Sequence, residues 1–124
     1  MRVSAIPYSN DVLPESVTLL ALPDVADQLG LAVTRVHQML RDRQILAVRR
    51  DGVIGVPKEF FDANGNIAKH LTGLITVMSD SKYTDEEILE WLYLEDDSLP
   101  GRPIDALHGD LAREVIRRAA ADPF

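Results

Sequence analysis

The sequence predicts a mainly α-helical protein with one small β-hairpin. Apolar residues recur at helical spacing through most of the 124 residues, whereas one short stretch has the period of a strand. In that stretch, Asp51-Gly52 separates two runs rich in β-branched residues, which is a strong local hairpin signal. The apolar fraction of 46% and the charged fraction of 27% are typical of a folded globular chain.

The first 17 residues predict an N-terminal arm rather than a regular element. Pro7 and Pro14 interrupt this segment, and the polar cluster at 8–11 has neither a helical nor a strand period. We expect residues 1–17 to be flexible or loosely docked, because a terminal segment without apolar periodicity has little surface to bury. The hydroxyls of its serines, and that of Thr18 directly after it, would then be open to modification.

The segment 18–62 predicts a compact unit that begins with two short helices. Apolar residues lie at helical spacing over about 23–29, where Pro23 suits the first turn and Gly30 suits the stop. A tight turn then leads into a second helix over 33–42. The inward face of this second helix is predicted to hold Val33, Val36 and Leu40.

A β-hairpin is predicted over 45–56, with strands at 45–49 and 53–56 and a turn between them. Pro57 ends the second strand, because proline cannot donate a hydrogen bond to a strand ladder. The same residue suits the first turn of a helical segment that starts near Lys58. The start of the second helix, by contrast, has Ala32 where a serine or threonine cap is common.

The remaining segment, residues 63–124, predicts a helical C-terminal domain. An apolar helical stripe runs from Ile67 to Met78. Thr84 and Glu87 form the capping-box pattern of a further helix that reaches about position 94. The rest of the chain is predicted as a loop at 95–103, a short turn at 104–107 and a last helix over 110–121, with Leu111, Val115 and Ile116 facing inward.

Two helices, a glycine-containing turn and a hairpin within about 40 residues have the layout of a winged helix-turn-helix. In this layout the outer face of the second helix enters the DNA major groove, and the hairpin, or wing, contacts the backbone or the minor groove. Side chains that can donate hydrogen bonds to bases or phosphates gather in these two places. The candidate DNA-binding residues are Thr34, Arg35, His37, Gln38, Arg41, Arg43, Arg49, Arg50 and Lys58.

The charge distribution favours a local contact with DNA in a chain that is acidic overall. The net charge of -7 by itself opposes binding to phosphates. Residues 34–58, however, hold six basic side chains against two acidic ones. A basic island in an acidic chain predicts one DNA-facing surface, with the acidic remainder limiting non-specific binding.

Four stretches of the chain resemble known families. Residues 22–57 are similar to the MerR and excisionase type of winged helix-turn-helix. With KHLTGL (69–74), DEEILEWL (85–92) and LPGRPIDALHG (99–109), the chain resembles the actinobacterial DNA-binding family known as a substrate of a membrane Ser/Thr protein kinase in mycobacteria. This resemblance implies a winged helix-turn-helix followed by a helical domain of unassigned role, with double-stranded DNA and a Ser/Thr protein kinase as partners. It also implies phosphorylation of the arm, at a position near Ser9.

Composition and pattern argue against several other functions. There is no cysteine, which excludes disulfides, thiolate metal sites and cysteine nucleophiles. The three histidines are scattered, so we expect no metal site, no cofactor, no catalytic residue and no enzymatic activity. No apolar run reaches the roughly 18 residues that a membrane span needs, and the N-terminus lacks a signal-peptide pattern. We therefore expect a cytoplasmic protein located at the nucleoid, without membrane contact.

The sequence is consistent with more than one role. A DNA binder of this kind is either a transcriptional regulator or a nucleoid-associated factor. Tight specific binding would require a second reading head, which a homodimer would supply. The alternative is an antitoxin-like or other protein-interaction module whose C-terminal helices bind a partner protein, because residues 91–115 are faintly similar to the toxin-binding domain of one antitoxin class.

Overall fold

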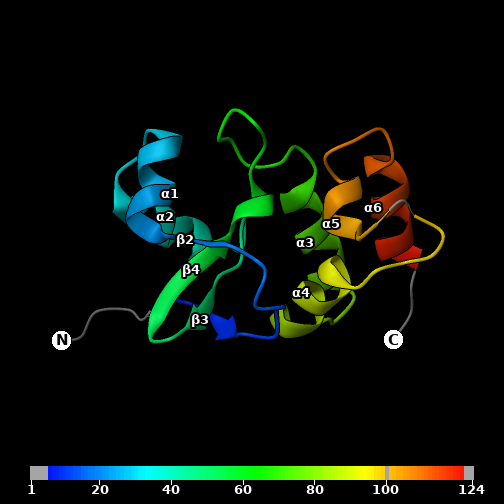
Figure 1. Cartoon of the computed structure of the whole chain (residues 1–124), viewed down its shortest axis with the longest axis horizontal. Helices are drawn as coiled ribbons and strands as arrows, with labels where there is room; N and C mark the ends of the chain where they lie inside the picture. The colour runs from blue at the N-terminus through cyan, green and yellow to red at the C-terminus, as the bar shows by residue number, and fades with distance from the viewer. Residues whose placement is uncertain (1–5, 100, 122–124) are drawn as a thin grey trace.

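The computed structural model describes residues 6–99 and 101–121. Figure 1 shows a winged helix-turn-helix on one side of the molecule and the helices of the C-terminal half on the other. Within the described ranges there are six α-helices, one short 3₁₀ helix and four strands. This arrangement confirms the predicted fold class, which is mainly α with a small β wing and a helical domain after it.

The helix-turn-helix consists of α1 (Leu22–Leu29) and α2 (Val33–Arg41). Pro23 lies in the first turn of α1, where the backbone N–H that proline lacks would have no helical partner. The residues that join the two helices to the core are Leu22, Val25 and Ala26 from α1 and Val36, Met39 and Leu40 from α2. Val33, which was predicted to face inward, is the first residue of α2 and is 37% exposed.

A four-stranded sheet lies beside these helices in the order β1-β3-β4-β2. Its strands are β1 (Ser9–Asn10), β2 (Leu19–Ala21), β3 (Val48–Arg50) and β4 (Val53–Pro57). Between β3 and β4, Asp51 and Gly52 have φ angles of 52° and 80°. Two consecutive positive φ angles are what a two-residue hairpin turn requires, so the predicted hairpin is confirmed.

The first strand of the hairpin is shorter than expected. Residues 45–47 are buried but are not part of β3, because Val48 opposite Gly55 is the last pair of the β3–β4 ladder. Beyond Gly55, β4 continues its pairing with β2 on the other side. Residues 45–47 are therefore apolar because they are buried, and not because they belong to a strand of the hairpin.

Residues 6–17 are packed against the wing, so this part of the expected arm, which was predicted to be flexible or loosely docked, is docked. The rest of the predicted arm, residues 1–5, lies outside the described residues. Ser9 and Asn10 pair in parallel with β3, and the Ser9 N–H donates to the Ala47 carbonyl over 2.8 Å. Leu13 and Val17 are 7% and 3% exposed. Two isolated apolar residues and a two-residue strand have no periodicity, so the pattern of the sequence does not reveal this docking.

The C-terminal half consists of short helices that follow the wing. They are η1 (Lys58–Phe60), α3 (Leu71–Asp80), α4 (Asp85–Tyr93), α5 (Pro103–Ala106) and α6 (Ala112–Ala121). The predicted capping box of α4 is confirmed: the Glu87 N–H donates to Thr84 Oγ1 over 3.1 Å, and the Thr84 N–H donates to Glu87 Oε1 over 2.8 Å. Ile67 was predicted to begin a helical stripe that reaches Met78. In the structure it lies before α3 and pairs with Phe61 in an isolated β-bridge.

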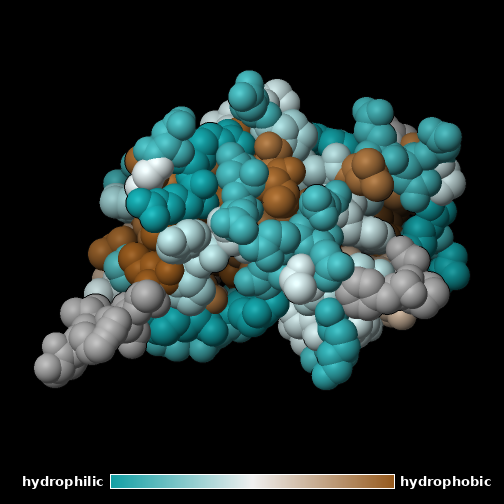
Figure 2. Space-filling model, turned by 90° about the horizontal axis from the view of Figure 1, so that it is seen from below, coloured by the Kyte–Doolittle hydropathy of each residue, from teal (hydrophilic) through white to brown (hydrophobic). Residues whose placement is uncertain are grey.

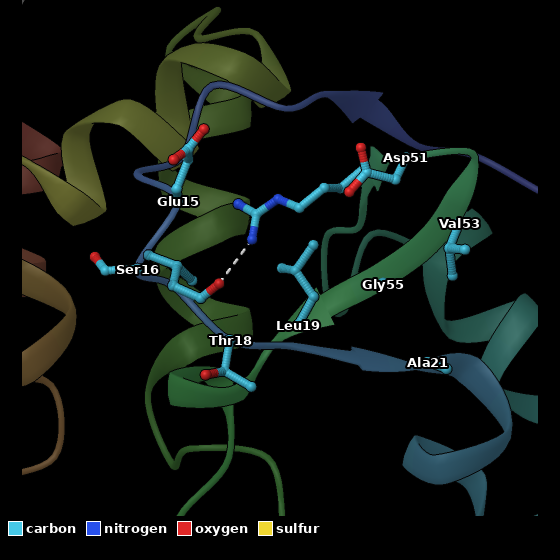
Figure 3. A pocket seen from close by; sticks show the side chains of 10 residues that line it. Glu15, Ser16, Thr18, Leu19, Ala21, Asp51, Val53 and Gly55 are labelled. Carbon is cyan, nitrogen blue, oxygen red and sulfur yellow. Dashed lines mark hydrogen bonds between the residues drawn. The ribbon is translucent and has the colours of Figure 1, made fainter.

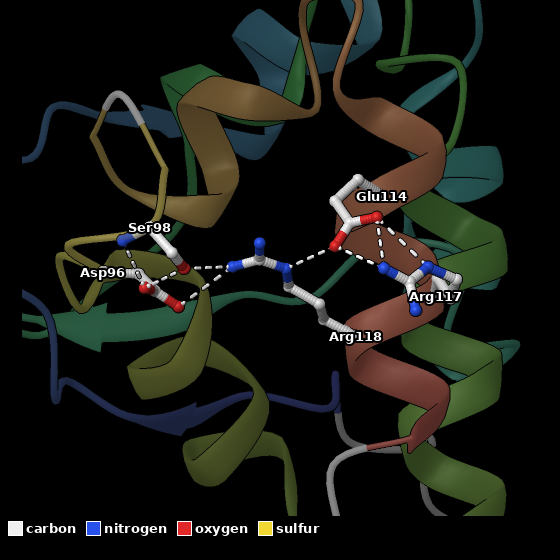
Figure 4. A network of polar contacts seen from close by, with 5 residues as sticks. All are labelled: Asp96, Ser98, Glu114, Arg117 and Arg118. Carbon is white, nitrogen blue, oxygen red and sulfur yellow. Dashed lines mark hydrogen bonds and ion pairs between the residues drawn. The ribbon is translucent and has the colours of Figure 1, made fainter.

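The last helix begins later than predicted. Leu111 precedes α6 and is 39% exposed, whereas Val115 is fully buried. Arg118 joins α6 to the loop between α4 and α5, because it binds Glu114 on its own helix and both Asp96 and Ser98 in that loop (Figure 4).

One continuous core joins the two halves. Phe60, Leu74, Leu89 and Ile104 are fully buried within the same cluster as the helix-turn-helix residues. At its edge the Tyr93 hydroxyl donates to Glu59 Oε1 over 2.9 Å. The helical domain thus supports the base of the wing. No helix among the described residues combines the length and the apolar character needed to span a membrane.

Candidate nucleic-acid interface

The outer face of α2 presents its polar side chains to solvent. Thr34, Arg35 and Arg41 are exposed, and His37 and Gln38 are half-buried. The helix contains two arginines and no acidic residue. Its first residues lack a side-chain cap, as expected from Ala32. This face therefore has the groups and the positive charge that the major groove of duplex DNA accommodates.

A hydrogen-bonded chain runs along the C-terminal part of this face. Arg41 donates to Gln38 Oε1 from Nη2 over 3.2 Å, and Gln38 Nε2 donates to Asp42 Oδ1 over 2.9 Å. Arg41 is held in place by a neutral amide rather than by a carboxylate. Its charge therefore stays available to a phosphate or a base edge, whereas Gln38 would have to exchange partners to bind a base.

The wing separates its two arginines. Arg49 pairs with Ile54, and Arg50 pairs with Val53, so successive side chains project from opposite faces of the hairpin. Arg49 is exposed, with its guanidinium 5.8 Å from the centre of the Tyr8 ring. Within the described part of the chain neither Arg49 nor Arg35 forms an ion pair with a carboxylate.

Arg50 does not present a free guanidinium, in contrast to the prediction that it contacts DNA. Its Nε lies 2.5 Å from Asp11 Oδ2, and its Nη1 donates to the Val17 carbonyl over 2.8 Å (Figure 3). The hydrogen bond from Arg50 lowers the pKa of the Asp11 carboxyl below its ordinary value. The side chain therefore joins the wing to residues 11–17.

The hollow next to Arg50 has a poor composition for binding phosphate. It encloses about 450 Å³ between residues 15–19 and the wing. Glu15 and Asp51 line it together with Arg50, whose charge is matched by Asp11. An anion entering here would meet two carboxylates and no free cation among the lining residues.

Arg43 is also engaged within the protein, in contrast to its predicted role at the edge of the DNA surface. Its guanidinium forms an ion pair with Asp85 and donates to Ser79 Oγ over 3.0 Å. Burial raises the pKa of Asp85, while Arg43 opposes that rise. Arg43 thereby fastens the end of α2 to α3 and α4.

Two further predicted residues lie away from the α2 face. Lys58 is exposed but begins η1, at the opposite end of β4 from the turn of the wing. Ser9 is 3% exposed, so its hydroxyl is not open in this arrangement. The residues that the sequence did not single out are Tyr8, which stacks on Arg49, and Asp11, which binds Arg50. The aromatic and acidic character of the 8–11 cluster, set against the basic wing, is the signal that could have indicated these contacts.

Comparisons with known proteins agree with the winged helix-turn-helix fold. Residues 5–61 match the family described as "DNA-binding protein Rv2175c, wHTH domain", and residues 68–122 match "Rv2175c C-terminal domain of unknown function". The chain is 42% identical to the DNA-binding protein Rv2175c of Mycobacterium tuberculosis over 132 residues, covering 97% of this chain and 90% of that protein. It also resembles the NMR structure of Rv2175c, with a TM-score of 0.86, 41% identity and coverage of 98% and 92% of the two chains. The chain belongs to the Rv2175c family of actinobacterial winged helix-turn-helix proteins.

Proposed function

We propose that this protein binds double-stranded DNA, with α2 in the major groove and Arg49 of the wing on the backbone or in the minor groove. The observation that carries the proposal is that Arg35, Arg41 and Arg49 are exposed and form no ion pair with a carboxylate within the described residues. The name of the Mycobacterium tuberculosis relative, a DNA-binding protein, supports the same function.

Each side chain has a role that follows from its chemistry. Arg35 and Arg41 offer guanidinium forks that suit guanine or phosphate, and Gln38 offers an amide that suits adenine. Thr34 and His37 add shorter donors. We leave Arg43 and Arg50 out of the proposed interface, because carboxylates of the protein already bind them.

The biological role we propose is that of a transcriptional regulator or a nucleoid-associated factor, acting at the nucleoid. One winged helix reads only a few base pairs, so specific binding at physiological salt requires two copies on neighbouring half-sites. A homodimer on DNA is therefore part of the proposal.

The test compares DNA affinity in variants that lose equal charge. A duplex selected by the wild-type protein from a random pool is titrated with wild type, with Arg35→Ala/Arg49→Ala and with the control Lys69→Ala/Arg113→Ala. The control removes two exposed cations from the C-terminal half. Loss of these two cations is expected to weaken binding in the first variant only, and to lower the slope of log affinity against log salt by about 1 for each arginine that neutralises a phosphate. Equal affinities in all three proteins would leave the proposal without support.

We further propose that a Ser/Thr protein kinase regulates binding through the arm, with Ser9 as the candidate residue. Because Ser9 is 3% exposed in β1, a doubly charged phosphate on it could not be buried. Phosphorylation would therefore require β1 to leave β3. The released arm would remain tethered near the wing, where its negative charge would compete with DNA for the exposed cations.

A phosphomimetic variant tests this regulation. Ser9→Glu is expected to expose residues 6–17 to limited proteolysis and to weaken DNA binding, whereas Ser9→Ala should retain both the docked arm and the affinity. Retention of wild-type affinity by Ser9→Glu, with the arm released, would contradict the role of the arm.

A second candidate function is the binding of a partner protein by the C-terminal helices. It is favoured by Leu94, which is 69% exposed at the end of α4. An isolated exposed leucine is common on protein surfaces, so this observation is weaker than the exposed cations of α2. Co-purification of one partner that Leu94→Ser abolishes, without loss of DNA binding, would promote this candidate.

A further inference from the structure

The corner between α1 and α2 carries apolar side chains on the surface. All residues from 30 to 35 are exposed, and those at 30–34 are uncharged. Leu31 and Val33 are 38% and 37% exposed, although both are large aliphatic residues. Figure 2 shows apolar surface at the end of the molecule that holds the helix-turn-helix and the wing tip, among largely hydrophilic residues.

The fold accounts for the apolar character of these two side chains only in part. The core contact between α1 and α2 is made by other residues, which are almost completely buried. At the turn the Leu31 backbone N–H donates to the Ala26 carbonyl over 3.0 Å, and an apolar residue in this place often packs against the end of the preceding helix. Even so, 38% of Leu31 stays in water. At Val33, the first residue of α2, a polar side chain would fit the same backbone and leave less apolar area in water.

The place of the corner on α2 indicates what covers it. In a helix-turn-helix the N-terminal residues of the second helix contact base edges, and Val33 is the first residue of α2. Base edges in the major groove present donors and acceptors with one apolar exception, the C5-methyl group of thymine. Phosphates and sugars offer no comparable apolar group to an aliphatic side chain.

We propose that Leu31 and Val33 contact thymine C5-methyl groups, so that the protein prefers duplexes with thymine opposite the start of α2. The inference rests on the proposed function, because it requires α2 to lie in the major groove. Thr34 and Arg35 follow directly on the helix and are exposed, so they bind polar base edges or phosphates beside the methyl groups. The corner thus adds a preference for particular bases to the positive charge of α2.

Uracil replacement tests the contact without changing charge or hydrogen bonding. The probe is a duplex selected from a random pool, made in one version with thymine and in others with deoxyuridine at one thymine at a time. Loss of one buried methyl contact weakens binding by about fourfold. The effect is expected at one or two thymines and not at the rest.

Variants assign the effect to the corner. Leu31→Ala/Val33→Ala should bring the ratio of thymine to deoxyuridine affinity close to one at those positions. Val53→Ala, which removes a 57% exposed apolar residue from the wing, is the matched control and should leave the ratio unchanged. Circular dichroism melting shows whether a variant has lost its fold. The comparison of thymine and deoxyuridine duplexes with the wild-type protein does not depend on any variant folding.

The outcomes separate this inference from the proposed function. Equal binding of the thymine and deoxyuridine duplexes by wild type overturns the inference while DNA binding stands. An undiminished ratio of thymine to deoxyuridine affinity in Leu31→Ala/Val33→Ala overturns the inference as well. So does self-association of the wild-type protein that this variant abolishes, because the corner would then be a contact between two copies of the chain. Failure to bind any duplex refutes the proposed function instead.

Discussion

The guanidinium of Arg50 on the wing is bound by the carboxylate of Asp11, with Nε 2.5 Å from Oδ2 and Nη2 3.2 Å from Oδ1. The same guanidinium donates to the carbonyls of Pro14 and Val17. One side chain thus organises the turn of the chain that leads from β1 to β2. Arg50 acts as a brace within the protein, whereas Arg49, its neighbour on the other face of the wing, stays exposed.

This pair predicts that Arg50 contributes to stability and not to DNA affinity. Arg50→Ala should lower the free energy of unfolding by about 1–2 kcal/mol, the contribution of charged hydrogen bonds in a partly exposed site. Urea denaturation measures that loss. In a DNA titration, Arg50→Ala should keep the wild-type salt slope, while Arg49→Ala should lower the slope by about 1.

A double-mutant cycle provides the control for the brace. Because Asp11 and Arg50 act on each other, Asp11→Ala should add little destabilisation to a protein that already carries Arg50→Ala. Additive losses would mean that the two side chains act separately, and a reduced salt slope in Arg50→Ala would return this residue to the DNA interface.

The acid dependence of stability follows from the lowered pKa of Asp11. Its side-chain hydrogen bond with Arg50 holds the pKa below the ordinary 3.8, so the unfolded chain binds a proton at a higher pH than the folded protein does. The stabilisation is therefore complete above pH 3.8 and is lost as the pH falls through the lowered pKa. Urea titrations should show wild type more stable than Asp11→Asn at neutral pH, with the difference closing below 3.8. A difference that does not vary with pH would contradict the ionic origin.

The parts of the fold that were predictable are those with a local signal. The pattern Asp51-Gly52 indicates the hairpin turn, and Thr84 with Glu87 indicates the start of α4, because each feature depends on a few adjacent residues. β1 was not predictable in this way because its partner, β3, lies 39 residues away in the register Ser9–Val48. A two-residue strand derives its stability from such tertiary pairing, not from its own composition.

The candidate site was predictable to a similar extent. The helical period assigned Arg35 and Arg41 to the outer face of α2, where the structure has them exposed. The same reasoning could not foresee that Arg43 and Arg50 find Asp85 and Asp11, since ion pairs between distant segments depend on the final packing. A basic residue in a sequence window indicates charge, and only the fold decides whether that charge faces outward.

Tyr93 predicts a decline in stability at high pH. The ring is 7% exposed and its hydroxyl donates to Glu59, and burial raises its pKa above the ordinary 10.0. Above pH 10 the unfolded chain loses this proton while the folded protein keeps it, so stability falls as the pH rises. Tyr93→Phe should cost about 1 kcal/mol at neutral pH, and the difference from wild type should shrink above pH 10. Tyr8→Phe, at an exposed ring, is the control and should change stability by less than about 0.5 kcal/mol.

Two glycines predict opposite effects of the same substitution. A Cβ on Gly55 in β4 would lie 2.9 Å from Leu19 Cβ and 3.3 Å from the Leu20 carbonyl oxygen, so Gly55→Ala forces β2 and β4 apart. We expect a loss of about 1–3 kcal/mol, as for other overpacked sites. Gly73 lies in α3, where an added Cβ would meet no neighbouring atom within 4 Å, so Gly73→Ala should gain about 0.5–1 kcal/mol through helix propensity. Thermal melting of both variants decides the point, because equal shifts in Tm would mean that the close approach of β2 to β4 does not constrain the wing.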